Sequence, residues 1–437
     1  MRTGRMLLVC LLVCLAPAAA RAVPAFARKT GIACSGCHEV WPRLNDFGQQ
    51  FRDNGFRLKH GRDAPVQQDP SYWPIAMRTT VGYQWLRQTL VPTDRGPVDA
   101  QTGTFGFSGL DVFSAGTLGE RISYLVTYTP SLASAGFQRS PADGDLESAF
   151  VGLHDLAGTT WLNIRVGRHS IDLPEDEHRT ITLTQGYNVY HFNPSGSLVA
   201  FAPGENQNGV EIYGHSELSR LRYSVSLVNA NGSPFSNNVL SSPALWGHLQ
   251  ASHLFDNPLL AEIKGGVFGA YGWAPTGTET APPPGGGPSE PVPGTAFGHK
   301  NFARYGAELH LYFLSNIYPL TLTGVVLGGA DDPELVPGAT DTTRFVGGWG
   351  EVSYTPTIHL TFLGRYERIR TTSGGVAGAF LDTGNQTIWT GAIRHTFELT
   401  NRTEVALHVE VSSAKITSDT GETPTTTAAL LGLDIAF

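Results

Sequence analysis

The chain has 437 residues, with 30 Lys and Arg against 38 Asp and Glu, so its formal net charge is −8. Charged residues make up only 16% of the chain, against roughly 25% in an average soluble protein, and its 51 glycines exceed the usual share of about 7%. There is no Gly period, heptad run or block of like charge, which excludes a collagen, a coiled coil and a long acidic tail. Because the chain is acidic, we expect no nucleic acid among its partners.

Residues 1–22 have the order of a secretory signal peptide. Arg2 and Arg5 give a basic start, an apolar stretch of ten residues follows at 6–15, and a small-x-small site ends at Ala22. A buried first helix is the alternative. After residue 22 no uninterrupted apolar run approaches the ~20 residues that a membrane helix needs. An exported chain of this kind is periplasmic, secreted or an outer-membrane barrel.

Two cysteines follow the signal, in the sequence Cys34-Ser35-Gly36-Cys37-His38. This C-x-x-C-H pattern is typical of c-type haem attachment, because two thiols at this spacing can each add to a vinyl group of one porphyrin. A zinc knuckle would need two more nearby ligands, and a thioredoxin-like pair would need a βαβ context. We therefore predict one covalent haem c on Cys34 and Cys37, with His38 as the axial iron ligand.

The residues after this motif predict a helix that packs on the haem. Trp41, Leu44, Phe47 and Phe51 recur at steps of three and four residues, and Asn54-Gly55 is a stop signal. An ordinary apolar core stripe is the alternative interpretation of this spacing.

The sequence offers two candidates for the sixth iron ligand. Met77 is the only methionine after the signal, and a Met/His pair would suit electron transfer. A lone Met is also often a plain packing residue. His60 is the second candidate, followed by histidines that face the inside of the barrel described next.

From about residue 75 onward, apolar and polar residues alternate strictly. In the segment 404–411, Val405, Leu407 and Val409 alternate with polar residues, as expected of strands with one apolar and one polar face. Many strands span ten to fourteen residues, whereas soluble strands have ~5–6 and membrane-barrel strands ~9–11. We count sixteen strands, starting near residues 75, 105, 121, 145, 159, 207, 219, 242, 258, 301, 320, 343, 359, 385, 402 and 424.

The connections between these strands alternate between short and long, as in outer-membrane barrels, which have short periplasmic turns and long external loops. The segments 172–206 and 272–300 are among the predicted external loops, and the second is expected to have no fold of its own. The sequence thus predicts an all-β, transmembrane outer-membrane β-barrel of about 16 antiparallel strands, preceded by a short helical segment. Charged residues expected inside the barrel either pair with one another, tune ion passage or seat the N-terminal segment: Arg165, Arg222, Arg365, Arg394, Glu308, Glu367, Glu404 and Glu410.

The stretch PAFARKTGIACSGCH at 24–38, with the following WPRLNDFG, resembles a family of bacterial outer-membrane cytochromes. Members carry one N-terminal haem c fused to a porin-like barrel and occur in iron-oxidising and metal-respiring bacteria. The resemblance implies a signal peptide at 1–22, a haem segment at 23–74 and a barrel at 75–437. It also implies a location in the outer membrane of a Gram-negative bacterium, with the haem segment on the periplasmic side or in the lumen.

By this resemblance the chain would transfer electrons between the cell exterior and periplasmic cytochromes or other carriers, rather than convert a substrate. The external partner would be an electron donor or acceptor, iron among them, and outer-membrane lipid would surround the barrel. Porins of this size are often trimers, so a homo-oligomer is a further expectation. The alternative is a solute or ion porin whose haem segment acts as a plug or sensor. A third hypothesis is a haem enzyme such as a peroxidase, with an open sixth iron position.

Overall fold

The computed structural model describes residues 25–40, 42–58, 74–91, 93–130, 145–177, 180–194, 196–230, 243–257, 259–281, 290–296, 298–314, 320–374, 385–399, 404–417 and 423–436. The predicted signal peptide at 1–22, Trp41 and His60 lie outside the described residues.

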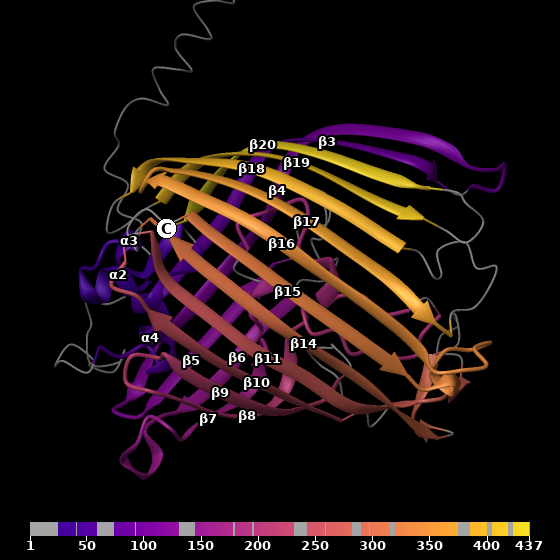
Figure 1. The fold of residues 1–437 in the computed structure, drawn as a ribbon, viewed down its shortest axis with the longest axis horizontal. Helices are drawn as coiled ribbons and strands as arrows, with labels where there is room; N and C mark the ends of the chain where they lie inside the picture. The colour runs from indigo at the N-terminus through magenta and orange to yellow at the C-terminus, as the bar shows by residue number, and fades with distance from the viewer. Residues whose placement is uncertain are drawn as a thin grey trace, which may run out of the picture.

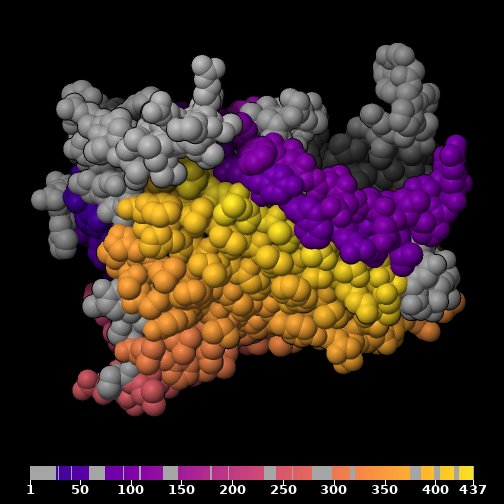
Figure 2. All heavy atoms as spheres, turned by 90° about the horizontal axis from the view of Figure 1, so that it is seen from above, coloured from indigo at the N-terminus to yellow at the C-terminus, as the bar shows by residue number. Residues whose placement is uncertain are grey.

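Sixteen long strands close into one antiparallel barrel (Figure 1). Each strand pairs with the next one along the chain, and the last strand pairs with the first, so that the yellow and purple strands meet on the outer wall in Figure 2. This confirms the predicted barrel. The predicted and observed first residues of the strands differ most at β4, which begins at Val98 and not near residue 105. The strands are β3 (Ile75–Val91), β4 (Val98–Gly119), β5 (Ile122–Thr129), β6 (Asp145–Leu153), β7 (Asn163–His169), β8 (Gln207–His215), β9 (Leu221–Val228), β10 (Ala244–Leu254), β11 (Leu260–Pro275), β14 (His299–Phe313), β15 (Leu320–Asp331), β16 (Thr343–Thr357), β17 (Leu360–Ser373), β18 (Asn385–Leu399), β19 (Glu404–Thr417) and β20 (Thr425–Ala436).

One predicted loop has a fold of its own. Between β11 and β14, the short strands β12 (Thr278–Ala281) and β13 (Glu290–Ala296) pair with each other. The prediction that this segment lacks structure is therefore wrong, because β12 and β13 run antiparallel and pair along their length.

The charged side chains of the wall point mainly into the barrel, and large apolar side chains cover the outside; inside, an apolar patch that includes Trp246 and Phe302 lies beside the charged groups. On β17, Arg365 and Glu367 are 3% and 0% exposed, whereas Phe362 and Tyr366 on the opposite face are 41% and 52% exposed. Successive side chains of a strand point to opposite faces, so the outer face carries a band of large apolar side chains. A lipid bilayer is the solvent that suits such a band.

The N-terminal segment, residues 25–58, lies at the end of the barrel where the short turns and the C-terminal end of β20 lie (Figure 1). It consists of α2 (Ala25–Thr30), α3 (Cys34–Cys37), β1 (His38–Val40), β2 (Arg43–Leu44) and α4 (Asp46–Asp53). No helix in the described part of the chain is long and apolar enough to cross a membrane.

The helix after the motif begins later than predicted. Residues 43–44 pair back onto β1, so that Leu44 lies opposite His38 in a small hairpin. Asn45 then caps α4, because its side chain accepts a hydrogen bond from the Gly48 amide. The predicted helix is therefore correct only from Asp46 onward.

The connection between β7 and β8 folds into the barrel, where we call residues 170–206 the inserted loop. Its residues Tyr187, Tyr190 and Phe201 are fully buried in the main apolar cluster, together with Trp246 and Phe302 of the wall. This long connection joins β7 and β8 at the end opposite the short turns, as predicted, but it folds into the barrel instead of outward, because these aromatic side chains are buried against the inner wall. Two carboxylates of the wall also bind backbone amides of the inserted loop. Glu410 accepts hydrogen bonds from the amides of Leu183 and Thr184, and Glu367 accepts them from the amides of Asn188 and Val189.

Smaller elements complete the fold. Three 3-10 turns occur in the described connections, at Leu156–Gly158, Asn188–Tyr190 and Pro333–Leu335. The last of these meets the inserted loop, because the Leu198 amide donates to the Leu335 carbonyl. All the charged residues that the sequence places inside the barrel lie on its inner wall, where they hold the inserted loop, pair with one another or, in the case of Arg222, contact the N-terminal segment.

Candidate haem c site

The C-x-x-C-H motif forms one helical turn that α4 holds in place. The Asn45 side chain donates to the Gly36 carbonyl at 3.1 Å, and the Asn45 amide donates to the Cys37 carbonyl at 3.0 Å. A Cβ added at Gly48 would lie only 2.0 Å from that same carbonyl oxygen, so only glycine allows α4 this close to the motif. Sequence reasoning included Asn45 and Gly48 in the resemblance but did not assign these roles.

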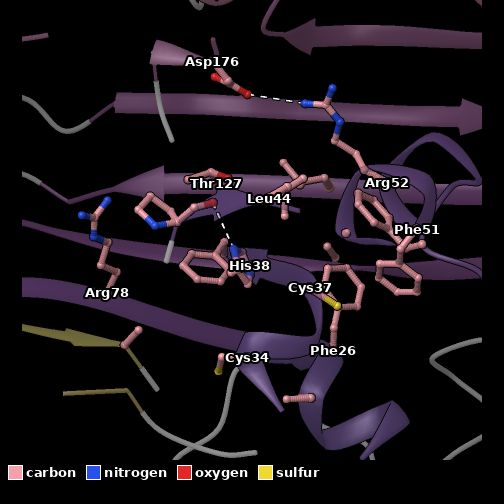
Figure 3. A pocket seen from close by; sticks show the side chains of 18 of the residues that line it. Phe26, Cys34, Cys37, His38, Leu44, Phe51, Arg52, Arg78, Thr127 and Asp176 are labelled. Carbon is pink, nitrogen blue, oxygen red and sulfur yellow. Dashed lines mark hydrogen bonds and ion pairs between the residues drawn. The ribbon is translucent and has the colours of Figure 1, made fainter. Parts of the chain in front are cut away.

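Cys34, Cys37 and His38 line one cavity of about 280 Å³ (Figure 3). Most of its other walls are apolar. The N-terminal segment supplies Phe26, Leu44, Phe47, Phe51 and Phe56, and the barrel wall supplies Phe113, Ala115, Leu125 and Phe150. Arg52, Arg78 and Arg165 add cationic groups to the lining, and three carboxylates, Asp111, Glu147 and Asp176, line it as well. This combination suits a large, flat, mostly apolar ligand with a polar edge.

The His38 ring is held in a defined orientation. Its Nδ1 lies 3.1 Å from the carbonyl oxygen of Pro42, which can only accept a hydrogen bond, so Nδ1 carries the proton (Figure 3). In the neutral ring the lone pair is then on Nε2. Metal-binding histidines are commonly oriented by this kind of bond from the second ring nitrogen.

The two cysteines are not joined by a disulfide bond. Burial raises the pKa of the Cys34 thiol to about 12 and that of the Cys37 thiol to about 11, so both are neutral at pH 7. Among the described residues, no group of three or more His, Cys, Asp or Glu side chains is arranged to hold a metal ion directly. The described residues therefore provide no additional ligands for the zinc alternative.

Met77 is not brought together with the other three residues. It lies on β3 opposite Val112, and the adjacent Arg78 points into the barrel, where it contacts Asp434 and lines the cavity. Since neighbouring side chains of a strand point to opposite faces, Met77 points to the outer face. Among the described residues that line the cavity, only His38 carries an imidazole, and none carries a thioether. Met77 therefore loses its support as sixth ligand, and His60 lies outside the described residues.

On one side, the N-terminal segment packs on β4, β5 and β6 through apolar side chains. Phe51 and Phe56 form a buried cluster with Ala115, and Phe26 stacks on Phe56 with a centroid distance of 4.9 Å. At the same edge, Arg57 forms an ion pair with Asp155 at 2.8 Å.

On the other side, the segment is held by ion pairs. Arg43 is buried against Glu351 of β16, Asp53 contacts Arg222 of β9 at 3.0 Å, and Lys264 of β11 contacts Asp46 at 2.6 Å. Contacts on β4–β6 and on β9, β11 and β16 mean that the segment spans the mouth of the barrel. The sequence contains these residues without any local sign of the pairing, because the partners lie far apart in the chain.

No protein family model matches the chain, and no curated protein matches it. Several solved structures, however, are similar to the chain in fold. An anion-selective porin from Comamonas acidovorans has 11% identity and a TM-score of 0.52, covering 83% of this chain and 99% of that one. The outer membrane channel DcaP of Acinetobacter baumannii has 11% identity and a TM-score of 0.51, covering 83% and 97%. The chain therefore has the fold of a porin-like β-barrel.

Proposed function

We propose that the chain is an outer-membrane barrel that carries one haem c in the cavity at its periplasmic mouth and exchanges electrons with periplasmic carriers. One observation carries the proposal: Cys34, Cys37 and His38 line a single apolar cavity, whose walls come from both the N-terminal segment and the barrel. A motif that arose by chance would have no reason to face such a cavity.

The location is supported by three independent features. The sequence predicts export, the outer face of the strands carries exposed apolar side chains, and the fold is shared with solved outer-membrane channels. Short turns lie at the end that holds the N-terminal segment, as at the periplasmic end of such barrels.

Each residue of the motif has a separate task in this proposal. The Cys34 and Cys37 thiols would hold the porphyrin through thioether bonds, and the His38 ring, whose Nδ1 faces the Pro42 carbonyl, would offer Nε2 to the iron. When bound, the haem supplies an iron that cycles between the ferric and ferrous states. The apolar walls exclude water from the cofactor, while Phe47, which lines the cavity and is 41% exposed, marks where the cavity comes closest to the periplasm.

The transfer of electrons to the exterior needs a further step. The hydrocarbon layer is ~30 Å thick, and one haem at one mouth does not span it. An external partner must reach into the lumen, or a second carrier must complete the path. Liposomes that hold the purified protein, with a reductant outside and an acceptor inside, test this part: no electron movement would refute it without affecting the haem itself.

Absorption spectra of the oxidised and reduced protein test the haem. We expect one covalent haem per chain, retained after acid–acetone extraction. Replacement of both Cys34 and Cys37 by Ser should abolish covalent attachment, while Ser35→Ala, within the same turn but without a thiol, should leave it unchanged. A wild-type barrel without haem would refute the proposal.

The porin-like fold favours a second candidate, a solute or ion channel with the N-terminal segment as its plug. Its test is conductance in planar bilayers. Large currents that do not depend on the haem redox state would place this function first.

A further inference from the structure

Five side chains form a chain of alternating carboxylates and imidazoles inside the barrel, which we call the relay; its three central members are buried and its two ends are partly exposed. His248 Nδ1 lies 3.0 Å from Asp172, and His248 Nε2 lies 3.0 Å from Glu308. The other oxygen of Glu308 lies 3.0 Å from His310 Nε2, and His310 Nδ1 lies 3.6 Å from Glu175. Asp172 and Glu175 belong to the inserted loop, while the other three residues belong to β10 and β14.

The geometry of His248 requires a doubly protonated ring. A carboxylate oxygen lies at hydrogen-bond distance from each of its two nitrogens, and a carboxylate can only accept. A neutral imidazole has one N–H, so it would direct a lone pair at Asp172 or Glu308. The His248 and Glu308 side chains are 1% and 0% exposed, so water cannot relieve that repulsion.

Both ends of the relay bind arginines of the N-terminal segment. Arg52 of α4 contacts Asp172 at 3.5 Å, and Arg43 of β2 contacts Glu175 at 3.6 Å. Arg52 also contacts Asp176 of the inserted loop at 3.7 Å (Figure 3). The relay therefore ends, in both directions, on the segment that spans the mouth of the barrel.

We propose that the barrel has an ion-conducting state and that the relay is the latch that keeps it closed, by holding the N-terminal segment across the mouth. With the His248 ring protonated on both nitrogens, Asp172 is held in place to bind Arg52. When His248 loses the proton on Nδ1, Asp172 is repelled, and the start of the inserted loop moves away from the arginines. The rest of the inserted loop keeps its bonds to β17 and β19, so the movement is confined to the start of this loop and the N-terminal segment.

The other charged groups around the relay are consistent with a latch that opens as the pH rises. Arg222 contacts Asp172 at 2.9 Å, Arg365 contacts Glu351 at 3.6 Å, and Arg43 joins Glu351 to Glu175. Burial alone would raise the pKa of Asp172, but Arg222, His248 and Arg52 hold it well below its ordinary value. Protonation of Asp172 therefore opens the latch only in strong acid, and loss of a proton from His248 is the step that opens it as the pH rises.

The test is ion conductance of the full-length, haem-loaded protein in planar bilayers between about pH 6 and pH 10, a range centred above the ordinary His pKa. We expect the wild type to be closed at pH 6 and to open as the pH rises. The double variant His248→Gln, His310→Gln should be open at every pH, because a Gln side chain has its donors on one nitrogen and an acceptor oxygen at its other end, so it cannot present a donor to carboxylates on two sides. Breaking a buried ion pair corresponds to a shift of about a hundredfold or more in the closed-to-open equilibrium.

Two matched histidine controls show whether the alkaline opening belongs to the relay. His191 lies in the same inserted loop but outside the relay, between Glu177 and Glu205, so His191→Gln should keep the alkaline opening. His395 lies on the outer face of β18, and His395→Gln should behave as the wild type. A second variant, Arg43→Gln with Arg52→Gln, opens the mouth without changing either imidazole.

The same samples give a haem spectrum and a measure of strand content by circular dichroism. A correctly folded double histidine variant that stays closed at pH 6, or an alkaline opening that disappears in His191→Gln, would overturn the latch. Loss of the haem spectrum in the wild type would instead overturn the proposed electron transfer and leave the latch standing, so the two failures are distinguishable.

Discussion

Replacement of Gly48 by Ala tests how closely α4 must approach the C-x-x-C-H turn. The added Cβ would lie 2.0 Å from the Cys37 carbonyl oxygen and 3.0 Å from a methyl carbon of Leu44. Because the obstacle at 2.0 Å is backbone, α4 must retreat by about an ångström and weaken the bond from the Asn45 amide to the same carbonyl.

The magnitude follows from two opposing effects. Ala in a helix interior is favoured over Gly by about 1 kcal/mol, whereas overpacking costs about 1–3 kcal/mol, with backbone clashes at the upper end. A net loss of about 2 kcal/mol corresponds to roughly a thirtyfold weaker seating of the N-terminal segment.

Limited trypsin digestion measures this seating in the full-length protein in detergent. Arg43 and Arg52 are shielded in the seated segment, at 7% and 19% side-chain exposure, so cleavage there reports its opening. We expect Gly48→Ala to increase the cleavage rate about thirtyfold if opening is fast relative to cleavage. Gly364→Ala on β17, where a Cβ meets no atom within 4 Å, is the control and should leave it unchanged. Cleavage of Gly48→Ala at the wild-type rate would refute the close contact.

Three further substitutions test other parts of the site. Met77→Leu should leave the reduced absorption spectrum unchanged, because Met77 points to the outer face of β3; a spectral change would restore it as an iron ligand. Asn45→Ala removes the α4 cap and should destabilise the segment by about 1 kcal/mol, seen as a roughly fivefold faster tryptic cut. Burial alone would lower the pKa of His191, but its bonds to Glu177 and Glu205 raise it to about 9. The stability that His191 contributes is therefore complete below pH 6.5 and lost as the pH rises through about 9, and His191→Gln should flatten the thermal midpoint over this range.

The alternation along the chain was sufficient to predict the strands. On β17, for example, exposure alternates from Thr361 to Arg370, with Phe362 and Tyr366 on the outer face and Arg365 and Glu367 on the inner face. Leu363 and Ile369 share the inner face, where they pack against other residues inside the barrel. A period of two fixes which face each residue occupies, and the short turns fix where each strand ends. The motif at Cys34–His38 predicted that its three side chains serve one ligand, and the structure places them on one cavity.

The inserted loop was not predicted, although a signal was present. Tyr187, Tyr190, Phe192 and Phe201 are concentrated in a long connection, and an exposed external loop has no need for so many aromatic side chains. Contacts such as that between Arg43 and Glu351 join residues 308 positions apart, and no local pattern marks them. Met77 was favoured as an iron ligand because it is the only methionine after the predicted signal peptide. Its direction depends instead on its place in β3, where alternate side chains point outward.

The order of assembly follows from where the partners of the N-terminal segment lie. Most of its ion pairs are made with β9, β11 and β16 and with the inserted loop, and Arg57 pairs with Asp155 beside β6. The inserted loop contacts a wall that reaches from β9 to β19. Because these partners lie on opposite sides of the barrel, the complete seat requires the closed barrel, in which β20 pairs with β3. We therefore expect the N-terminal segment to take its place last, with its charged contacts formed and broken against an already closed wall. A segment seated in this way can be unseated without unfolding the barrel, which is the property that both a removable plug and a docked electron carrier require.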